Sequence, residues 1–467
     1  MATQVAQLRS INPYTEEEIE SFDVSTEREI DAALNAAHAA SQGHDAHGWR
    51  DTTPAQRATL LRRVAGLLRD DTARHALSIT REMGKPLAES RAEVEKCAVA
   101  CDYVADNLAM FLADEPAPSD SASSFIAFEP LGTVLACMPW NFPYWQVFRC
   151  AAFGIGAGNC VVLKHANNVT RCALNLAELF AAAGFPPGVF ATLVLPVETV
   201  ADLIADPRIA AVSLTGSTAA GRSVGRHAGE HLKKCVLELG GSDAFVVLDD
   251  ADLDEAAKVG ARSRFQNAGQ SCIAAKRFIV MESVAGDFVE RFVAEAERMV
   301  LGDPCDDRTT MGPLARRDLV QSLERQLNES VRQGARLRTG GTRPDRGGCF
   351  FTPTVIDRCD AETSAFHHET FGPLAAVATV ASEADALQLA NHSMFGLGGN
   401  VWTRDLDRGL HFARRLESGG VFINGMTHSD PRIPFGGVKE SGYGRELHRS
   451  GMLEFVNLKT IWLPRHD

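Results

Sequence analysis

Apolar runs of strand length alternate with amphipathic stretches through the first half of the chain. A short apolar run bounded by turn residues is typical of a buried strand, whereas apolar residues spaced by three and four favour a helix. Their alternation predicts a parallel sheet with crossover helices, the α/β class. The expected strands are 133–137, 161–164, 190–195 and 209–214; the expected helices follow Pro143, cover 173–183 and begin at Ser217.

The same alternation resumes after Gly241 and continues to about Phe435. The chain has 467 residues, which is too long for one hydrophobic core. We therefore expect a second α/β unit in this half. Its first strands are expected at 244–248 and 277–280, and its first helices at 253–265 and 285–299.

The N-terminal part and the chain end carry local signals of other elements. Thr26 and Glu29 have the spacing of a capping box, which predicts the start of a helix. Segments 124–128 and 454–463 are typical of extended strands, and we expect them to pair in a small separate sheet. Further helices are expected at 57–68 and 88–111.

Composition and charge indicate which kinds of partner the protein is not expected to bind. The chain is 45% hydrophobic and 23% charged, which is typical of a soluble globular protein, and its net charge is −13. Nucleic acids and anionic membranes bind basic surfaces, so neither is expected as a partner. There is no apolar run of membrane-spanning length, and residues 1–10 lack the pattern of a signal peptide.

The 11 cysteines are scattered, without the paired spacing of a zinc site. Reduced thiols in the cytoplasm are therefore expected, and no bound metal.

Two short runs carry the most reactive side chains. Glu238 stands in LELGG and Cys272 ends NAGQSC, so each lies beside glycines that let a ligand approach the backbone. A thiol near a carboxylate suggests covalent catalysis with a separate base. Burial at the end of an apolar run would raise the pKa of Glu238, as a general base requires. The alternatives are an inert buried cysteine and an ion pair of Glu238 with Lys233 or Lys234.

Asn141 stands in PWNFP, directly after the expected strand 133–137. At such a strand-to-helix turn, a side-chain amide can point into a cleft and donate to a developing oxyanion. The alternative is an asparagine that caps the helix after Pro143.

A nucleotide site is indicated where LTGS, and then Gly221, follow the fourth expected strand. A strand, a Gly/Ser turn and a helix start form a common phosphate site. The glycines of 154–158 precede a strand, so they are not a dinucleotide fingerprint. Lys164 could hold a ribose or phosphate, or be solvated. Glu369 and Phe371 would suit a ribose and a nicotinamide face, or belong to a capped loop.

Together and in this order, these motifs resemble those of the aldehyde dehydrogenase superfamily over nearly the whole chain. The similarity is greatest to bacterial succinate-semialdehyde dehydrogenases. That resemblance implies NAD(P)+-dependent oxidation of succinate semialdehyde to succinate through a cysteine thiohemiacetal and thioester. The matching stretches are 139–143, 161–166, 214–221, 237–241, 269–277, 369–373, 422–426 and 434–439.

The resemblance also implies residue roles. Cys272 would be the nucleophile and Glu238 the base, and the Asn141 amide would form an oxyanion hole with the Cys272 backbone N–H. No metal is required. The dinucleotide would be held by Trp140, Lys164, Asn167, Gly216, Ser217, Gly221, Leu239, Glu369 and Phe371.

The fold implied by the resemblance has three parts. A Rossmann-like dinucleotide-binding domain would comprise 1–112 and 131–240, and an α/β catalytic domain 241–440. Residues 113–130 and 453–467 would form a small oligomerisation sheet, so a homodimer or homotetramer is expected.

A semialdehyde acid needs a cation at the far end of its pocket. Arg149 lies eight residues after the asparagine of PWNFP, about two helical turns, and matches a carboxylate-binding arginine of the resembling enzymes. Trp145 would line the pocket, and Ser429 or His428 would supply a hydrogen bond. Gln266 stands where many of those enzymes have a second arginine. Glutarate semialdehyde and neutral aliphatic aldehydes are therefore alternative substrates.

The cofactor is expected to be NADP, with NAD also usable. NAD-preferring relatives often carry a glutamate where this chain has Asn167, and its absence removes a repulsion of the 2′-phosphate. A different class of enzyme, a Cys/Glu hydrolase, is the alternative, but the nucleotide-site motifs count against it. A non-catalytic member of the fold is a third interpretation, disfavoured because all three catalytic residue types are present.

Overall fold

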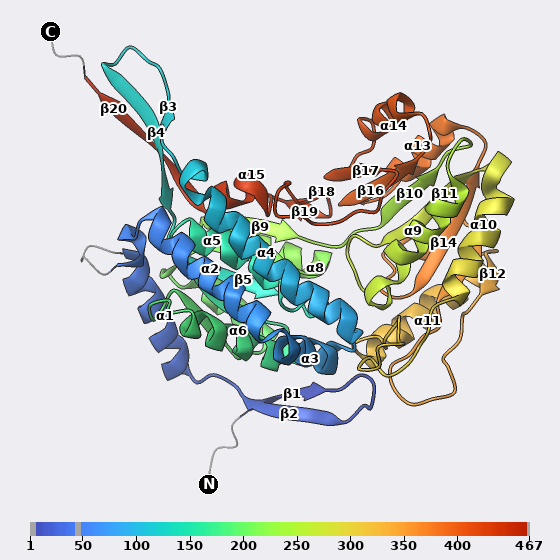
Figure 1. Cartoon of the computed structure of the whole chain (residues 1–467), viewed down its shortest axis with the longest axis horizontal. Helices are drawn as coiled ribbons and strands as arrows, with labels where there is room; N and C mark the ends of the chain where they lie inside the picture. Colours follow the sequence, from blue (N-terminus) through green and yellow to red (C-terminus); the bar gives the residue numbers. More distant parts are fainter. Residues whose placement is uncertain (1–5, 43–47, 465–467) are drawn as a thin grey trace.

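The computed structural model describes residues 6–42 and 48–464. Residues 1–5, part of the segment examined for a signal peptide, and residues 465–467, at the end of the expected oligomerisation sheet, lie outside the described residues. Two large sheets form the centres of two lobes, and a narrow arm projects from the first lobe (Figure 1). The predicted α/β class is confirmed.

The first sheet has the strand order β19-β9-β8-β5-β6-β7, with every pair parallel except β9–β19. All residues of β5 and β6 are buried, as expected of strands covered on both faces. The strands are β5 (Thr133–Met138), β6 (Cys160–His165), β7 (Phe190–Leu193), β8 (Ile209–Thr215), β9 (Lys234–Glu238) and β19 (Gly442–Tyr443). The helices of this lobe are α1 (Glu27–Gln42), α2 (Pro54–Asp70), α3 (Thr72–Met83), α4 (Leu87–Phe111), α5 (Trp145–Gly156), α6 (Thr170–Ala182), α7 (Val200–Ala205), α8 (Thr218–Glu230) and α15 (His448–Leu453).

The second sheet has the order β12-β13-β14-β11-β10-β16-β17 and is parallel except for the edge pair β12–β13. Its strands are β10 (Asp243–Val247), β11 (Ala275–Met281), β12 (Arg336–Thr339), β13 (Thr354–Asp357), β14 (Leu374–Val380), β16 (Gly398–Trp402) and β17 (Gly420–Ile423). Its helices are α9 (Leu253–Phe265), α10 (Glu282–Glu297), α11 (Arg317–Arg332), α12 (Ser364–His367), α13 (Glu383–Asn391) and α14 (Leu406–Ala413).

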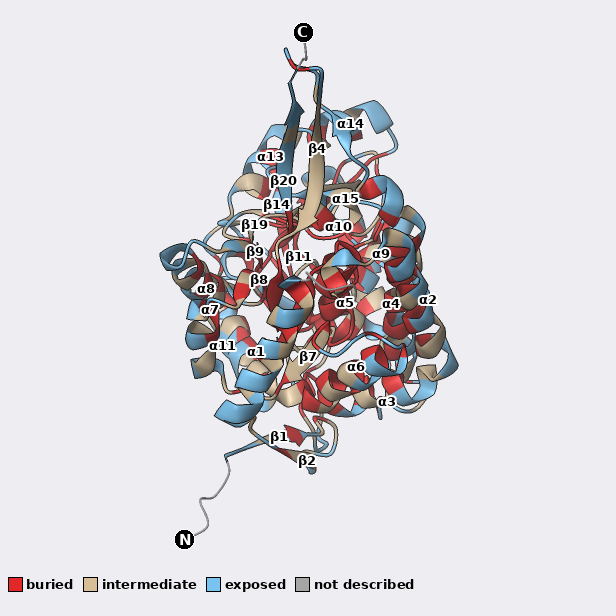
Figure 2. Cartoon of the chain, turned by 90° about the vertical axis from the view of Figure 1, so that its left-hand side faces the viewer, coloured by how far each residue is buried: buried red, intermediate tan, exposed pale blue. Residues whose placement is uncertain are grey.

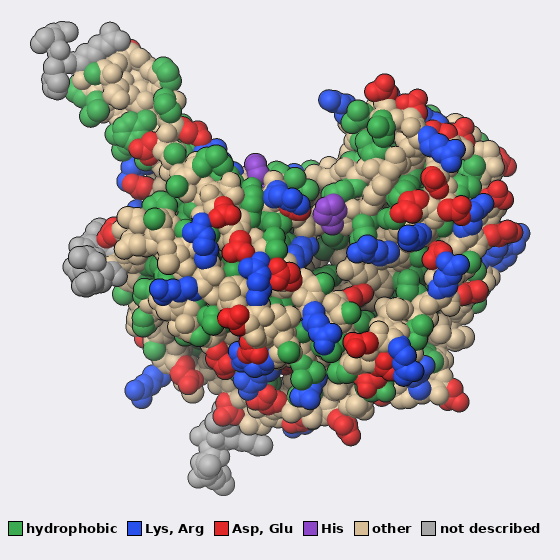
Figure 3. Space-filling view, viewed as in Figure 1, with side chains coloured by type: hydrophobic (Ala, Val, Ile, Leu, Met, Phe, Trp, Pro, Cys, Tyr) green, Lys and Arg blue, Asp and Glu red, His purple; other side chains and the backbone are tan. Residues whose placement is uncertain are grey.

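The projecting arm is the antiparallel sheet β20-β4-β3. Strand β20 pairs with β4 along its full length, from Val456 opposite Pro130 to Leu463 opposite Ser123, so the predicted pairing of these distant segments is confirmed. Figure 2 shows that the arm is half-buried or exposed, and Figure 3 shows hydrophobic side chains along it. The bounds are β3 (Glu115–Pro116), β4 (Ser123–Pro130) and β20 (Val456–Leu463).

Two short antiparallel pairs were not foreseen in the sequence. A hairpin of β1 (Gln7–Ile11) and β2 (Glu18–Asp23) precedes the first helix, and β15 (Phe395–Gly396) pairs with β18 (Val438–Lys439). The two-residue strands β15 and β18 are too short for a periodic signal.

Helix starts follow the predicted capping chemistry. Thr26 Oγ1 accepts a hydrogen bond from the Glu29 backbone N–H at 3.3 Å, and Glu29 Oε2 accepts one from the Thr26 N–H at 2.7 Å. Ser217 caps α8 by accepting from the Ala220 N–H at 3.2 Å. These caps fix where the helices begin relative to the sheets.

Buried apolar side chains form two clusters, one around each large sheet. The chain passes from the first sheet to the second between Glu238, the last residue of β9, and Asp243, the first of β10. Parallel strands of one sheet end at the same edge, which is where α/β proteins bind ligands. The ends of β5, β8 and β9 therefore meet the second lobe at this crossing.

Candidate active site

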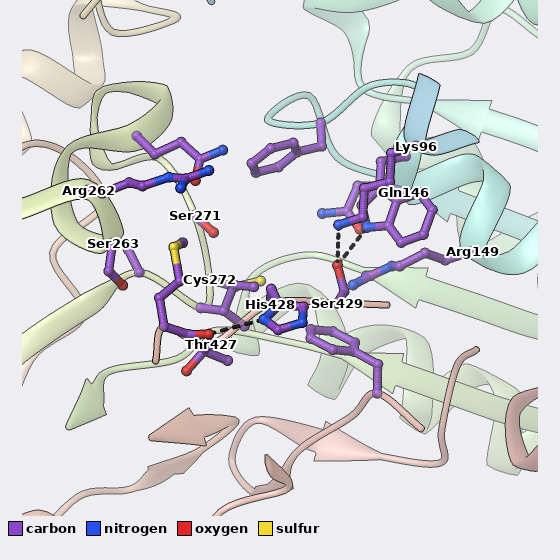
Figure 4. Close-up of a pocket in the computed structure, with 17 residues that line it drawn as sticks. Lys96, Gln146, Arg149, Arg262, Ser263, Ser271, Cys272, Thr427, His428 and Ser429 are labelled. Atoms are coloured by element: carbon purple, nitrogen blue, oxygen red, sulfur yellow. Dashed lines mark hydrogen bonds between the residues drawn. The ribbon is translucent and has the colours of Figure 1, made fainter. Parts of the chain in front are cut away.

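Two cavities meet at Cys272. The first has a volume of about 360 Å³ and lies between α4, α5, the end of α9 and the loop before Phe435 (Figure 4). The second, about 260 Å³, lies between the turns after β5, β8 and β9 and the loop containing Phe371. Gln146 and Cys272 line both cavities. The thiol is thus accessible from both cavities, so two ligands could meet there.

The loop that carries Cys272 is held through its carbonyl groups. The fully buried Lys276 donates hydrogen bonds to the carbonyl oxygens of Ser271 at 2.9 Å and Cys272 at 2.8 Å. Its Nζ is also 3.3 Å from Glu369 Oε1. One lysine therefore joins the nucleophile loop to the Glu369 loop. The sequence motif contained Lys276, but its role in holding the loop was not predicted.

Two glycines make room for these contacts. A Cβ on Gly241 would lie 2.5 Å from the carbonyl oxygen of Cys272, and one on Gly240 would lie 2.5 Å from Glu369 Oε2. The Gly241 N–H also donates to Glu369 Oε1 at 3.0 Å. The glycines of LELGG therefore allow a close approach of protein groups, the Cys272 carbonyl and the Glu369 carboxylate, where the sequence suggested the approach of a ligand.

Asn141 lies against the same loop. The Asn141 side-chain amide donates to the backbone carbonyl oxygen of Gln270 at 3.1 Å. The backbone carbonyl of Asn141 accepts a hydrogen bond from the side-chain amide of Asn267 at 2.8 Å. Asn141 does not cap the following helix, whose N-cap position is Tyr144. Asn141 and Cys272 both line the second cavity, so the structure brings these two predicted residues together.

The Cys272 side chain is partly exposed, at the point where the two cavities meet. Burial raises the pKa of Cys272 to about 11, while the positive charges of Arg149 and Lys276 act in the opposite direction. The thiol is therefore predominantly protonated at neutral pH in this state. A reaction at this sulfur needs a base or an added positive charge in one of the cavities.

Glu238, at the end of β9, is 2% exposed. The expected ion pairs are not formed: Lys233 donates to the Asp206 carbonyl at 2.5 Å and Lys234 pairs with Glu454. Among the described residues, neither oxygen of the Glu238 carboxyl has a hydrogen-bond partner. Burial and the nearby Glu446 raise the pKa of Glu238 to about 8, and Arg149 opposes this rise. Such a pKa suits a general base near neutrality.

Arg149 is buried and joins two parts of the site. Its Nε is 2.7 Å from Glu446 Oε2, its Nη2 donates to Thr215 Oγ1 at 3.2 Å, and its guanidinium lies 4.6 Å from the centroid of Phe435. It also lines the first cavity, as predicted. The prediction that Arg149 lies two turns after Asn141 on one helix was wrong, because α5 begins at Trp145, after Asn141. Glu446, brought in by the chain end, was not foreseen.

The side of the first cavity near α4 and α5 is polar and cationic (Figure 4). Ser429 Oγ accepts hydrogen bonds from Trp145 Nε1 at 2.8 Å and from Lys96 Nζ at 2.9 Å. The structure thus brings together the predicted Trp145 and Ser429. Lys96 lies on α4, distant in sequence from any recognised motif, and was missed. Gln266, which stands where many of the resembling enzymes have a second arginine, lines this cavity.

The second cavity collects six of the predicted cofactor residues. The rings of Trp140 and Phe371 meet edge to face with centroids 5.7 Å apart, and Ser217 presents the N-terminus of α8. An aromatic wall beside a helix N-terminus fits a nicotinamide joined to a phosphate. The six lining residues are Trp140, Gly216, Ser217, Leu239, Glu369 and Phe371.

Three other predicted cofactor residues lie outside the linings of the two cavities. Lys164 Nζ donates to Asn167 Oδ1 at 3.0 Å, at the end of β6. Gly221 lies on α8, where a Cβ would meet Leu239 Cδ1 at 2.4 Å, so its lack of a side chain allows the helix to pack closely. The geometry thus gives Gly221 a packing function.

Across residues 6–42 and 48–464, no cluster of three His, Cys, Asp or Glu side chains could hold a metal ion. No helix within the same ranges is long and apolar enough to cross a bilayer. All 11 cysteines are unpaired.

Comparison with known proteins gives consistent matches over the whole length. The aldehyde dehydrogenase family profile matches residues 1–461. A Synechocystis protein named probable succinate-semialdehyde dehydrogenase, NADP(+), is 46% identical over 456 residues, covering 98% of this chain and 99% of that protein. The Escherichia coli K12 protein named succinate semialdehyde dehydrogenase, NAD(P)+, is 47% identical over 457 residues, 98% of each. The crystal structure of succinic semialdehyde dehydrogenase from Streptococcus pyogenes with NADP+ matches with a TM-score of 0.95 at 38% identity, covering 98% of this chain and 100% of that one.

Proposed function

The chain belongs to the aldehyde dehydrogenase family, and we propose that it oxidises succinate semialdehyde to succinate with NADP+ as the preferred acceptor and NAD+ as a usable one. The observation that carries the proposal is the position of Cys272, between a cavity with a cationic, hydroxyl-bearing side and a second cavity suited to a nicotinamide. The relatives named for this reaction support the choice of substrate and cofactor.

Acylation begins when the Glu238 carboxylate takes the proton of the Cys272 thiol and Sγ attacks the aldehyde carbon to give a thiohemiacetal; Glu238 then passes this proton to solvent. The oxygen that becomes negative accepts hydrogen bonds from the Asn141 amide and the Cys272 backbone N–H. One hydrogen of the Asn141 amide is engaged by the Gln270 carbonyl, which fixes the group and leaves the other hydrogen for the substrate. A donor of this kind typically contributes about 3–4 kcal/mol to the transition state.

When bound in the second cavity, the cofactor supplies a hydride acceptor beside Cys272. Trp140, Phe371 and Leu239 would enclose the nicotinamide, and the N-terminus of α8, at Ser217, would face a phosphate. Lys164 and Asn167 would hold the adenosine side. After oxidation, the substrate remains attached to Cys272 as a thioester.

Deacylation depends on Glu238. The carboxylate takes a proton from a water molecule, whose oxygen attacks the thioester carbon; the C–S bond breaks, and succinate and the thiolate are released. A pKa of about 8 keeps Glu238 basic enough to accept this proton near neutrality. Lys276 holds the Cys272 loop in place through both steps.

Cofactor choice follows from the end of β6. Asn167 is neutral and accepts a hydrogen bond from Lys164, so residue 167 carries no charge that would repel a 2′-phosphate from the lysine. The ratio of kcat/KM for NADP+ and NAD+ tests this choice; strict use of NAD+ would contradict it.

The arm formed by β3, β4 and β20 supports self-association. Strand β20 is an edge strand with exposed Leu458, Trp462 and Leu463, which a second copy of the chain would cover in a homodimer or homotetramer. The unpaired cysteines favour a reducing compartment, the cytoplasm.

The reaction is tested by following NADPH formation from a panel of aldehydes with the purified protein. Succinate semialdehyde should give a higher kcat/KM than glutarate semialdehyde or butanal. A preference for either of the other two would overturn the proposed substrate, and release of acid without NADPH or NADH would favour the hydrolase.

A further inference from the structure

The ammonium group of Lys96 faces the first cavity from α4 (Figure 4). Its Nζ lies 2.9 Å from Ser429 Oγ and 4.2 Å from the centroid of the Trp145 ring. Among the described residues, Lys96 forms no ion pair. Lys96 is half-buried, and withdrawing a cation from water without a paired anion costs free energy unless another group compensates its charge.

The acidic residues nearest to Lys96 already have other partners. Glu93 forms a buried ion pair with Lys85. Asp430 is paired with Arg432, with Oδ2 and Nη2 2.6 Å apart. The charge of Lys96 is therefore not neutralised locally by the protein.

The two other cations that line this cavity differ from Lys96. Arg149 is buried, but its charge is balanced by Glu446 at 2.7 Å. Arg262 is exposed and lies on the opposite side of the cavity from Lys96 in Figure 4. Lys96 thus combines partial burial with the absence of an ion-pair partner among the described residues.

The Ser429 hydroxyl adds a donor at the same point. Its oxygen accepts from Lys96 Nζ and from Trp145 Nε1, and both of these groups act only as donors. The hydroxyl hydrogen must then point elsewhere, and Ser429 lines the cavity. An ammonium and a hydroxyl hydrogen side by side suit an acceptor with two oxygens, such as a carboxylate.

The protonation state of Lys96 is compatible with this use. Burial lowers the pKa of Lys96 to about 8, with the positive charge of Arg149 acting in the same direction. The ammonium form still predominates at neutral pH, and a bound carboxylate would favour it further.

We propose that Lys96, with the Ser429 hydroxyl, binds the terminal carboxylate of the semialdehyde and is the residue that selects an acidic over a neutral aldehyde. This inference rests on the proposed function. Gln266, at the end of α9, is uncharged. Lys96 on α4 supplies a positive charge to the same cavity instead. Arg149 contributes positive potential but keeps its own ion pair.

The test compares succinate semialdehyde with butanal, which has the same number of carbon atoms but no carboxylate, using NADP+. In Lys96→Met, the ratio of kcat/KM for the acid to kcat/KM for butanal should fall by about 10- to 100-fold, mainly through KM for the acid. Lys96→Arg should recover most of the ratio because it keeps the charge. Arg91→Met removes a positive charge from an exposed site of the same helix and should leave the ratio unchanged.

Equal losses with both aldehydes in Lys96→Met, or no loss, would overturn the inference, as would failure of Lys96→Arg to recover the ratio. If Lys96→Met does not fold, Ser429→Ala decides, because it should lower the ratio in the same sense and an unchanged ratio would contradict the inference. A wild-type enzyme that does not prefer the acid would instead contradict the proposed substrate, so the two failures are distinguishable.

Discussion

Arg149 Nε lies 2.7 Å from Glu446 Oε2, and both side chains are almost completely buried, at 2% and 1% exposed. Glu238 lies close enough for Glu446 to raise its pKa and for Arg149 to lower it. The chain end thus pairs Glu446 with a cation whose charge also acts on Glu238 and on the Cys272 thiol. Arg149 is therefore coupled to the base as well as to the first cavity.

Loss of Arg149 should impair oxidation of every aldehyde. Arg149→Met leaves Glu446 buried without a cation, which typically costs about 3–5 kcal/mol of stability, and it raises the pKa of Glu238. We expect a lower melting temperature and lower kcat with both succinate semialdehyde and butanal. The double variant Arg149→Met/Glu446→Gln should be more stable than Arg149→Met alone in thermal unfolding. A loss confined to succinate semialdehyde would instead assign Arg149 to the substrate carboxylate.

Hydrolysis of the acyl-enzyme should accelerate as pH rises. A carboxyl group with a pKa of about 8 is a base only in its ionised form, whose fraction grows about tenfold per pH unit below that value. The hydrolysis rate constant from rapid quenching should therefore climb from about pH 6 and level off above about pH 8. Glu446→Gln removes a like charge and should move the plateau to lower pH; an unmoved profile would show that another group titrates.

Lys276 should position the nucleophile without touching the substrate. Lys276→Met removes the donors to the carbonyl oxygens of Ser271 and Cys272 and the ion pair with Glu369. We expect kcat to fall about 10- to 100-fold, since misplacement of a reacting group by about 1 Å can have that effect. Alkylation of Cys272 by iodoacetamide should change in rate as well. Unchanged kcat and alkylation would remove this function.

Gly241 should be intolerant of a side chain. Gly241→Ala places a Cβ 2.5 Å from the Cys272 carbonyl oxygen, a backbone atom, so the nucleophile loop must move. The expected result is a loss of kcat of at least about tenfold with a folded protein by circular dichroism. Gly286→Ala, at an exposed position of helix α10 with no atom within 4 Å of the new Cβ, is the matched control and should retain full activity.

The sequence predicted the elements with a strong local signal. The buried strands at 133–137 and 209–214 and the helix at 253–265 appear in the structure with nearly the expected bounds. The pairing of the arm strands was also foreseen, because both segments stand outside the α/β alternation. Cys272 and Asn141 were indicated for the same reason, since the glycine-bearing run NAGQSC and the proline-flanked turn PWNFP both have a recognisable local pattern.

What the sequence missed depends on contacts between distant segments. Glu446 reaches Arg149 because β19 pairs with β9 and returns the chain end to the first sheet. Lys96 reaches Ser429 across 333 positions of sequence separation. The sequence of α4 gives no information about which loop will lie opposite Lys96.

The central claim, a thioester on Cys272 that Glu238 helps to hydrolyse, is tested most directly by trapping it. Glu238→Gln is mixed with succinate semialdehyde and NADP+, quenched in acid within one turnover and digested for mass spectrometry. A succinyl group on the peptide containing Cys272, near one per active site and longer-lived than in the wild type, is the predicted result. NADPH formation with no acylated Cys272 peptide, or with the acyl group on another residue, would contradict it.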